Sequence, residues 1–272
     1  MMDNTFSRPK TPLGVGSLIG ESFSVLFRNF VLIVAIAFVP ILLGNLISGL
    51  LVGYEVAIEV KAPNITTTGE AVAYVLSFLS KTIADSLGTI LLVQLVYEIK
   101  LRQSVRLVRL FDRVPSVILP MFVLNLAFSL LAIEVLLENI TRLSLGSVGY
   151  LLLCIPQFWL YSVFFVMAPA IVIEYLGVRG FGRSAGLTKG YRWPIVGLVV
   201  LINIVFLAVA IGMIYVIDVV TNLGGSAAGM ILSSLVVALD SGFVSVLFVL
   251  TYVRLREIKE GVSVDQIAAV FD

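Results

Sequence analysis

Three ionisable residues stand inside otherwise apolar stretches of this sequence. Lys81 and Asp85 are four positions apart, which places them on one face of a helix, and Asp240 lies in another apolar stretch. Asn125 and Asn203 add hydrogen-bonding groups to such stretches. An ionisable side chain inside a membrane costs roughly 2.5–3.5 kcal/mol on insertion scales, so we expect it to be paired or to carry protons or ions.

Two interpretations of the three ionisable residues remain open. In the first, Asp85 and Asp240 form a proton or ion path, and Lys81 is its internal counter-charge. In the second, Lys81 is charged and paired with at least one of the two carboxylates, while the other faces a water-filled cleft or also bonds to Lys81. A path would be favoured by further carboxylates at the same depth or by a broken helix there.

The sequence has no recognisable catalytic or metal-binding pattern. It contains no histidine and one cysteine, Cys154, within an apolar run. This composition excludes Ser-His and Cys-His catalytic pairs, histidine-ligated metals and an intrachain disulfide. The glycines of residues 14–20 follow the pattern GxGxxxG, which is not the dinucleotide-binding pattern GxGxxG. We therefore expect no enzyme activity, no metal and no cofactor.

The composition is that of a membrane protein. Hydrophobic residues make up 60% of the chain and charged residues 13%, against roughly 45–50% and about 25% in soluble globular domains. A hydrocarbon core ~30 Å thick needs about 20 helical residues to cross it. Six continuously apolar stretches are that long: 29–52, 70–97, 116–137, 149–173, 194–217 and 229–253. The sequence predicts an all-α, polytopic membrane protein with six transmembrane helices in a single domain, 1–272.

The positions of the basic residues predict the orientation. Most of the 18 Lys and Arg lie before the first span, in the second and fourth connections, or in the tail 254–272. Cytoplasmic segments carry this excess of positive charge, so both termini are expected in the cytoplasm of a bacterial inner membrane. Segment 1–28 is then a cytoplasmic tail with an interfacial helix. The net charge of +1 does not favour a nucleic-acid partner.

Amphipathic segments precede the first, third and fifth spans. Residues 13–30 carry apolar side chains at helical spacing, which is typical of a helix lying in the membrane interface. Before the third span, basic residues recur at i, i+4, i+7 and i+11: Arg102, Arg106, Arg109 and Arg113. Near an anionic leaflet each cation is worth about 1 kcal/mol. We interpret this stripe as a lipid-surface contact, the alternative being a solvated connection whose charges only set topology.

Glycines recur every four residues before the fifth span, at Gly182, Gly186 and Gly190. On a helix this spacing leaves one face without side chains, which allows another helix to approach closely. Because each glycine costs roughly 1 kcal/mol of helix propensity, packing is expected to compensate. The sequence therefore predicts a helix-packing site here.

Two stretches of the chain resemble one known family. Their matching residues are Pro169, Glu174, Arg183, Ser184, Leu187, Thr188, Gly190 and Trp193 in the first, and Tyr252, Arg254, Arg256, Glu260, Gly261 and Asp265 in the second. The chain thereby resembles the membrane domain that is fused to some bacterial glycerophosphodiester phosphodiesterases, together with its stand-alone, mostly uncharacterised relatives. In the fused enzymes a separate soluble barrel carries the catalysis, and such a barrel needs about 250 residues. The resemblance implies a membrane module without the phosphodiesterase activity.

These observations favour a non-catalytic accessory or structural subunit within a larger inner-membrane complex. Its expected contacts are anionic lipids of the inner leaflet and either a protein partner or further copies of itself. A secondary transporter or lipid-handling protein that uses Lys81, Asp85 and Asp240 is the alternative. An intramembrane enzyme is the third class, for which the sequence offers no catalytic residues.

Overall fold

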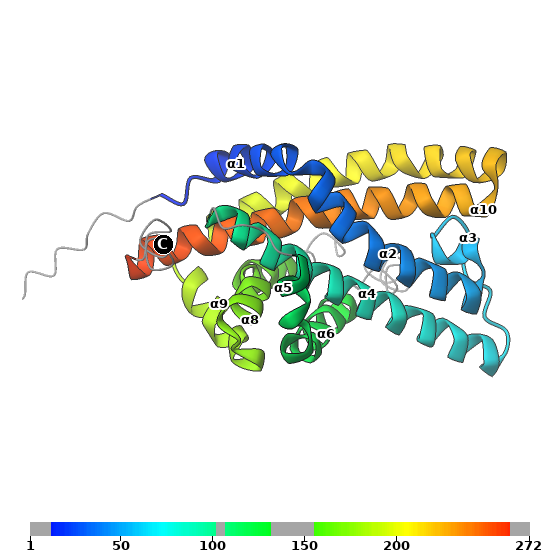
Figure 1. The fold of residues 1–272 in the computed structure, drawn as a ribbon, viewed down its shortest axis with the longest axis horizontal. Helices are drawn as coiled ribbons and strands as arrows, with labels where there is room; N and C mark the ends of the chain where they lie inside the picture. Colours follow the sequence, from blue (N-terminus) through cyan, green and yellow to red (C-terminus); the bar gives the residue numbers. More distant parts are fainter. Residues whose placement is uncertain (1–11, 102–106, 132–154, 262–272) are drawn as a thin grey trace, which may run out of the picture.

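The computed structural model describes residues 12–101, 107–131 and 155–261, and the regular structure of these residues is helical (Figure 1). The predicted all-α class is confirmed. The stretches long and apolar enough to cross a membrane are α2 (Phe30–Val52), α4 (Thr68–Lys100), the segment Ile155–Glu174 that ends in α8 (Met167–Glu174), and α10 (Arg192–Glu260). They are consistent with a multi-pass membrane protein. Cys154, Arg102 and Arg106 lie outside the described residues.

The other helices are shorter. They are α1 (Val15–Arg28), α3 (Tyr54–Ala57), α5 (Leu107–Asp112), α6 (Val114–Leu131), the 3-10 turn η2 (Gly177–Arg179) and α9 (Gly180–Thr188). Asn29, with φ −122° and ψ 26°, ends α1 and precedes α2, so the amphipathic segment is a helix separate from the apolar one. The third predicted span, 116–137, is described only as far as the end of α6.

Helix α10 folds back on itself at Gly225. The helix spans 69 residues, but Gly225 within it has φ 79° and ψ 169°, a backbone conformation that essentially only glycine can adopt. Figure 1 shows the two arms, drawn in yellow and orange, running side by side in opposite directions. The predicted stretches 194–217 and 229–253 lie on opposite sides of this turn. We call residues 192–224 the first arm of α10 and residues 226–260 the second arm.

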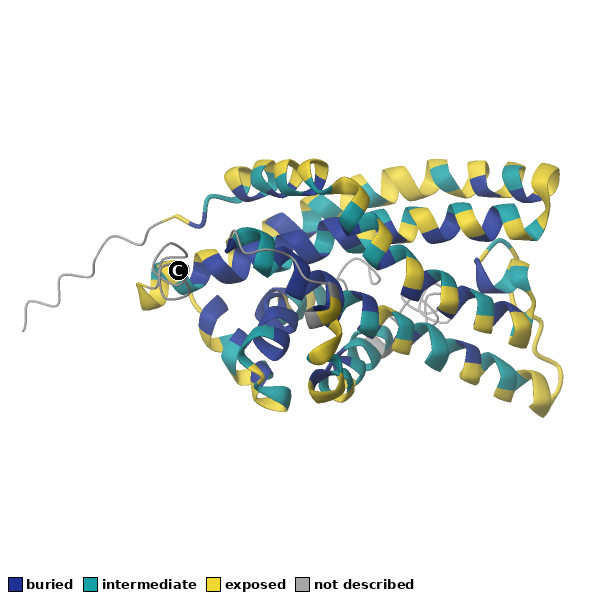
Figure 2. Ribbon diagram, viewed as in Figure 1, coloured by how far each residue is buried: buried dark blue, intermediate teal, exposed yellow. Residues whose placement is uncertain are grey.

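The packed core lies where α2, α4, α8 and the second arm of α10 meet. Its fully buried side chains include Ile33, Leu92, Ile171, Leu247 and Tyr252. Figure 2 shows this region in dark blue, whereas much of the first arm of α10 and the far end of α4 are exposed. Apolar surface gains little from leaving lipid, so such a core is held by close packing and by polar contacts between helices.

Two glycines allow the helices of this core to approach closely. A Cβ atom at Gly44 of α2 would lie 2.7 Å from Ala84 Cβ of α4, and one at Gly242 of α10 would lie 2.7 Å from Ile33 Cγ2 of α2. Small residues at such crossings are what membrane helix packing requires.

We expect Gly242→Leu to lower the free energy of unfolding by about 1–3 kcal/mol, the usual cost of overpacking a filled core. Gly197→Leu is the matched control, because a Cβ at Gly197 of the same helix meets nothing within 4 Å. Titration of the detergent-solubilised protein with SDS, followed by tryptophan fluorescence, measures both. Equal stability of the two variants would contradict the close approach at Gly242.

Candidate functional site

Polar side chains from three separate helices converge at one end of the bundle. Glu174 is the last residue of α8, and Arg183 lies in α9. Tyr175 follows with φ 55°, in the left-handed region, and turns the chain through η2 into α9. Helix α9 then lies close against α8, since a Cβ at Gly180 would be 2.6 Å from Ile171 Cγ1. This turn brings the side chains of Arg183 and Glu174 together.

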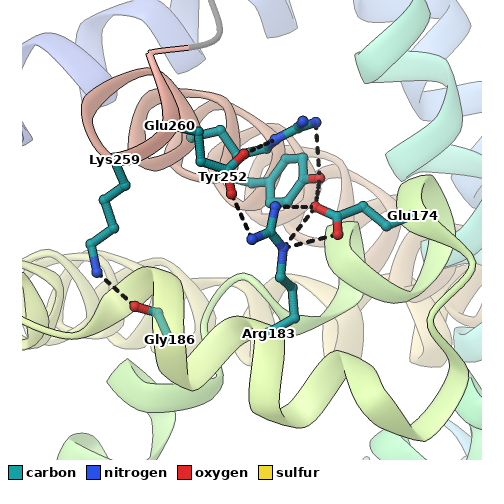
Figure 3. A network of polar contacts seen from close by, with 7 residues as sticks. Glu174, Arg183, Gly186, Tyr252, Lys259 and Glu260 are labelled. Carbon is teal, nitrogen blue, oxygen red and sulfur yellow. Dashed lines mark hydrogen bonds and ion pairs between the residues drawn. The ribbon is translucent and has the colours of Figure 1, made fainter.

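The third contributor is the end of α10. Tyr252, Arg256 and Glu260 are spaced by four residues, so one face of the second arm presents all three. Figure 3 shows this face pointing toward Glu174 and Arg183.

Arg183 connects two carboxylates from different helices. Its Nε and Nη2 donate to Glu174 Oε2 and Oε1, both at 2.9 Å, and its Nη1 lies 2.5 Å from Glu260 Oε1. A guanidinium suits this role because its donors form a planar fork that matches a carboxylate. The hydrogen bonds that Arg183 donates to Glu174 are the main cause that raises the pKa of Arg183, so this residue stays charged.

Tyr252 and Arg256 complete a ring of hydrogen bonds and ion pairs with these three residues. The Tyr252 hydroxyl donates to Glu174 Oε1 at 2.5 Å and accepts from Arg256 Nη1 at 3.3 Å, and Arg256 Nε donates to Glu260 Oε2 at 2.9 Å. We call Glu174, Arg183, Tyr252, Arg256 and Glu260 the polar ring. It holds two positive and two negative charges and is therefore neutral overall. Because each member is bonded to two others, the ring is suited to holding helix ends together rather than to proton transfer.

The five residues of the polar ring all belong to the two stretches that carry the family resemblance. The sequence did not show that these stretches meet, since 69 positions separate Arg183 from Tyr252. Ser184 and Thr188 from the same stretches hold α9 in place, because their hydroxyls donate to the Val163 carbonyl at 2.9 and 3.1 Å.

Among the residues that the structure describes, no close helix contact is seen at Gly182 or Gly186, so the predicted packing role of Gly182, Gly186 and Gly190 stays a prediction. Within the described ranges, a Cβ at Gly182 or Gly186 would meet no atom within 4 Å. Gly190 lies beyond the end of α9 with φ 90°, where it serves a turn. The Gly186 carbonyl instead accepts from Lys259 Nζ at 2.6 Å (Figure 3). The close contact of α9 with α8 is made by Gly180.

Lys81 is paired, but with a different carboxylate from those expected. Its Nζ donates to the Ala57 carbonyl at 2.8 Å and lies 3.3 Å from Glu59 Oε1, both in or after α3. The prediction that Asp85 or Asp240 is the direct partner is therefore wrong. The connection that follows α2 folds back onto α4 and brings Glu59 to Lys81. The spacing of residues within α4 could not reveal this contact.

Asp85 shares a cavity with Lys81, whereas Asp240 does not line it. This cavity of about 200 Å³ lies between α2, α4 and the second arm of α10, and Asn45, Glu59 and Ser233 also line it. Asp240 is exposed on the second arm of α10. The structure thus groups two of the three ionisable residues with Glu59 and leaves Asp240 apart.

The basic stripe before the third span is described only in part. Arg102, Arg106 and the side chain of Arg109 lie outside the described residues. The guanidinium of Arg113 lies 5.1 Å from the centre of the Tyr175 ring, in a cation–π contact next to the polar ring.

We expect Lys81→Met to lower the free energy of unfolding by about 1 kcal/mol, mainly through the lost hydrogen bond to the Ala57 carbonyl. Adding Asp85→Asn should restore part of this loss, because it removes a carboxylate that Lys81 neutralises across the cavity. Adding Glu59→Gln should restore little, since the Glu59 side chain is 84% exposed and water solvates its charge. The SDS titration tests the three variants, and rescue by Glu59→Gln but not by Asp85→Asn would show that the charge of Lys81 mainly offsets Glu59 rather than Asp85.

Among the described residues no group of three His, Cys, Asp or Glu side chains is placed to hold a metal ion. No protein-family model, curated protein or solved structure matches the chain.

Proposed function

We propose that this chain is a six-span accessory subunit of a bacterial inner membrane, with both termini in the cytoplasm, related to the membrane domain of the phosphodiesterases named above. It acts without catalysis, through helix packing and lipid contact, within a larger complex. The neutral polar ring supports a structural role, because its members hold one another. The distribution of basic residues supports the orientation.

The observation that carries the proposal is the exposure of the first arm of α10. Large apolar side chains are exposed along most of its length, among them Leu201, Ile204, Leu207, Ile214 and Leu223. The second arm, by contrast, is buried in the core over much of its length. Ile195, Leu198 and Val199 bury the beginning of the first arm in the core, and the rest of this arm offers a large apolar surface to lipid or to another helix.

One polar residue in this exposed arm supports contact with another helix rather than with lipid. Asn203 is exposed, and its amide nitrogen donates to the Val199 carbonyl of its own helix at 2.8 Å. No described residue donates to the side-chain oxygen of Asn203, which can therefore accept a hydrogen bond. Asparagines in membrane spans commonly bond across to a neighbouring helix.

Native extraction in polymer nanodiscs followed by size analysis tests the complex. Gly212→Trp places a bulky group on the first arm at a position where a Cβ meets nothing within 4 Å, so the fold should tolerate it. We expect the wild type to migrate within a larger complex and Gly212→Trp to be released from it. Val39→Trp on α2, where the native side chain is 56% exposed, is the matched control. A wild-type chain that migrates alone would contradict the accessory role.

Reporter fusions test the orientation separately. Fusions after Gly53, Asn139 and Asn222 should report the periplasm, and fusions after Gln103 and Gly180 the cytoplasm. Any reversal of this pattern contradicts the six-span arrangement.

The polar cavity favours a second candidate function, that of a transporter. Asn45, Glu59, Lys81 and Asp85 would supply an ion or a polar solute with charged and hydrogen-bonding groups between three apolar helices. Purified protein in vesicles with a pH-sensitive dye tests proton movement under an imposed potential. A proton flux that Asp85→Asn abolishes would favour this candidate over the accessory subunit.

A further inference from the structure

A larger cavity, of about 850 Å³, lies beneath α1 at the end of the bundle where α4 and α10 finish. One wall is the polar stripe of α1, namely Ser17, Glu21, Ser24 and Arg28, which recur at helical spacing. The opposite wall carries Lys100, Arg254 and Glu257. The stripe that makes α1 amphipathic thus faces an open cavity whose lining is part polar and part apolar.

The charges of this cavity leave one cation uncompensated. Lys100 pairs with Glu21, and Arg254 pairs with Glu257 at 3.4 Å. Arg28 also lines the cavity, and within the described part of the chain its guanidinium makes no hydrogen bond or ion pair. These ion pairs leave some N–H groups of Lys100 and Arg254 free, because an ammonium has three donors and a guanidinium has five. The cavity therefore offers an anion several free donors and a net charge of +1.

A singly charged phosphate diester fits this balance better than a dianion. Guanidinium and ammonium donors are the groups that proteins use to bind phosphate oxygens. A second negative charge would meet the carboxylates of Glu21 and Glu257 without a further cation to offset it.

The surroundings of the cavity suit the acyl chains of a lipid. Phe23 and Phe27 lie beside the polar stripe on α1, are 43% and 67% exposed, and stack with centroids 6.1 Å apart. Phe23 also packs on Phe243 of the second arm of α10, at 4.7 Å. Exposed aromatic side chains next to a polar stripe are typical of a helix at the membrane interface.

We propose that the cavity under α1 binds the phosphodiester of an anionic phospholipid, with Arg28, Lys100 and Arg254 as its phosphate donors. This inference rests on the proposed function only in placing this end of the bundle at the cytoplasmic leaflet. It adds a defined headgroup site to the general lipid contact proposed above.

Native mass spectrometry of the full chain, released from mixed phosphatidylglycerol and phosphatidylcholine nanodiscs, tests the site. The wild type should retain phosphatidylglycerol in preference to phosphatidylcholine. Arg28→Gln should weaken this retention about fivefold, the factor that corresponds to about 1 kcal/mol for one cation. Arg179→Gln is the matched control, because Arg179 is an exposed cation outside the cavity. Equal retention by the two variants would overturn the proposal.

A second variant separates loss of lipid binding from misfolding. A second ligand shows whether the bound phosphate group belongs to a lipid or to a soluble anion. Ser24→Trp fills the cavity from an exposed position on α1 and should displace the lipid while the SDS titration stays near that of the wild type. Inorganic phosphate at millimolar concentration should not compete. If inorganic phosphate displaced the lipid, the cavity would be a site for a soluble anion, and the lipid assignment would be overturned. The result is independent of the size analysis of the native complex, since a chain that lacks a protein partner can still retain the lipid.

Discussion

Arg183→Met is expected to lower the free energy of unfolding by about 3 kcal/mol, because it leaves the carboxylates of Glu174 and Glu260 without their shared cation. Only 29% of the Arg183 side chain, 20% of Glu174 and 25% of Glu260 are exposed, so water compensates poorly. The SDS titration of the detergent-solubilised protein measures the change.

Two further variants separate charge from geometry in the polar ring. Arg183→Lys keeps the charge but loses the fork that binds two oxygens of Glu174, so we expect an intermediate loss. Lys61→Gln removes one partner of an exposed pair, with side chains 70% and 50% exposed, and should change the stability by less than about 0.5 kcal/mol. A ring that is only a surface feature would give Arg183→Met and Lys61→Gln the same small effect.

Gly225→Val is expected to cost about 1–3 kcal/mol, because a branched side chain cannot adopt the backbone conformation of the α10 turn without strain. The φ of 79° and ψ of 169° lie in a region that only glycine occupies readily. The strain should favour a straighter α10 and disturb the pairing of its two arms. Gly212→Val is the matched control, since Gly212 lies within the first arm and a Cβ there meets open space.

Two measurements report on Gly225→Val. The SDS titration gives the stability, and a disulfide between cysteines introduced at Thr221 and Gly229 reports whether the turn still forms. A Cβ at Gly229 would lie 3.1 Å from Thr221 Cβ, slightly closer than the ~3.5–4.5 Å of a disulfide, so the wild-type turn should form this bond after a small outward shift. Efficient crosslinking in a Gly225→Val background, with unchanged stability, would show that the turn does not depend on glycine.

The helical, membrane-spanning character of the chain follows from the sequence alone. Continuous apolar stretches need lipid and internal backbone hydrogen bonds, and helices supply those bonds within each segment. The separation of α1 from α2 follows from a local pattern as well, because the polar stripe of α1 gives way to a mostly apolar run after Asn29. Each of these conclusions depends on neighbours within a few turns of the chain.

The tertiary structure alone decided which polar groups meet. The partner of Lys81 is Glu59, which a connection returns to α4, and helical spacing could point only to Asp85. In the described part of the chain a Cβ at Gly182 or Gly186 meets no neighbour, and sequence spacing could not show this, because packing depends on what another element brings to that face. The polar ring joins residues that are far apart in sequence, and the cavity under α1 exists because two helix ends lie opposite one amphipathic stripe. Periodicity determines the face of a helix on which a residue lies, but the partner opposite that face is determined by how the whole chain folds.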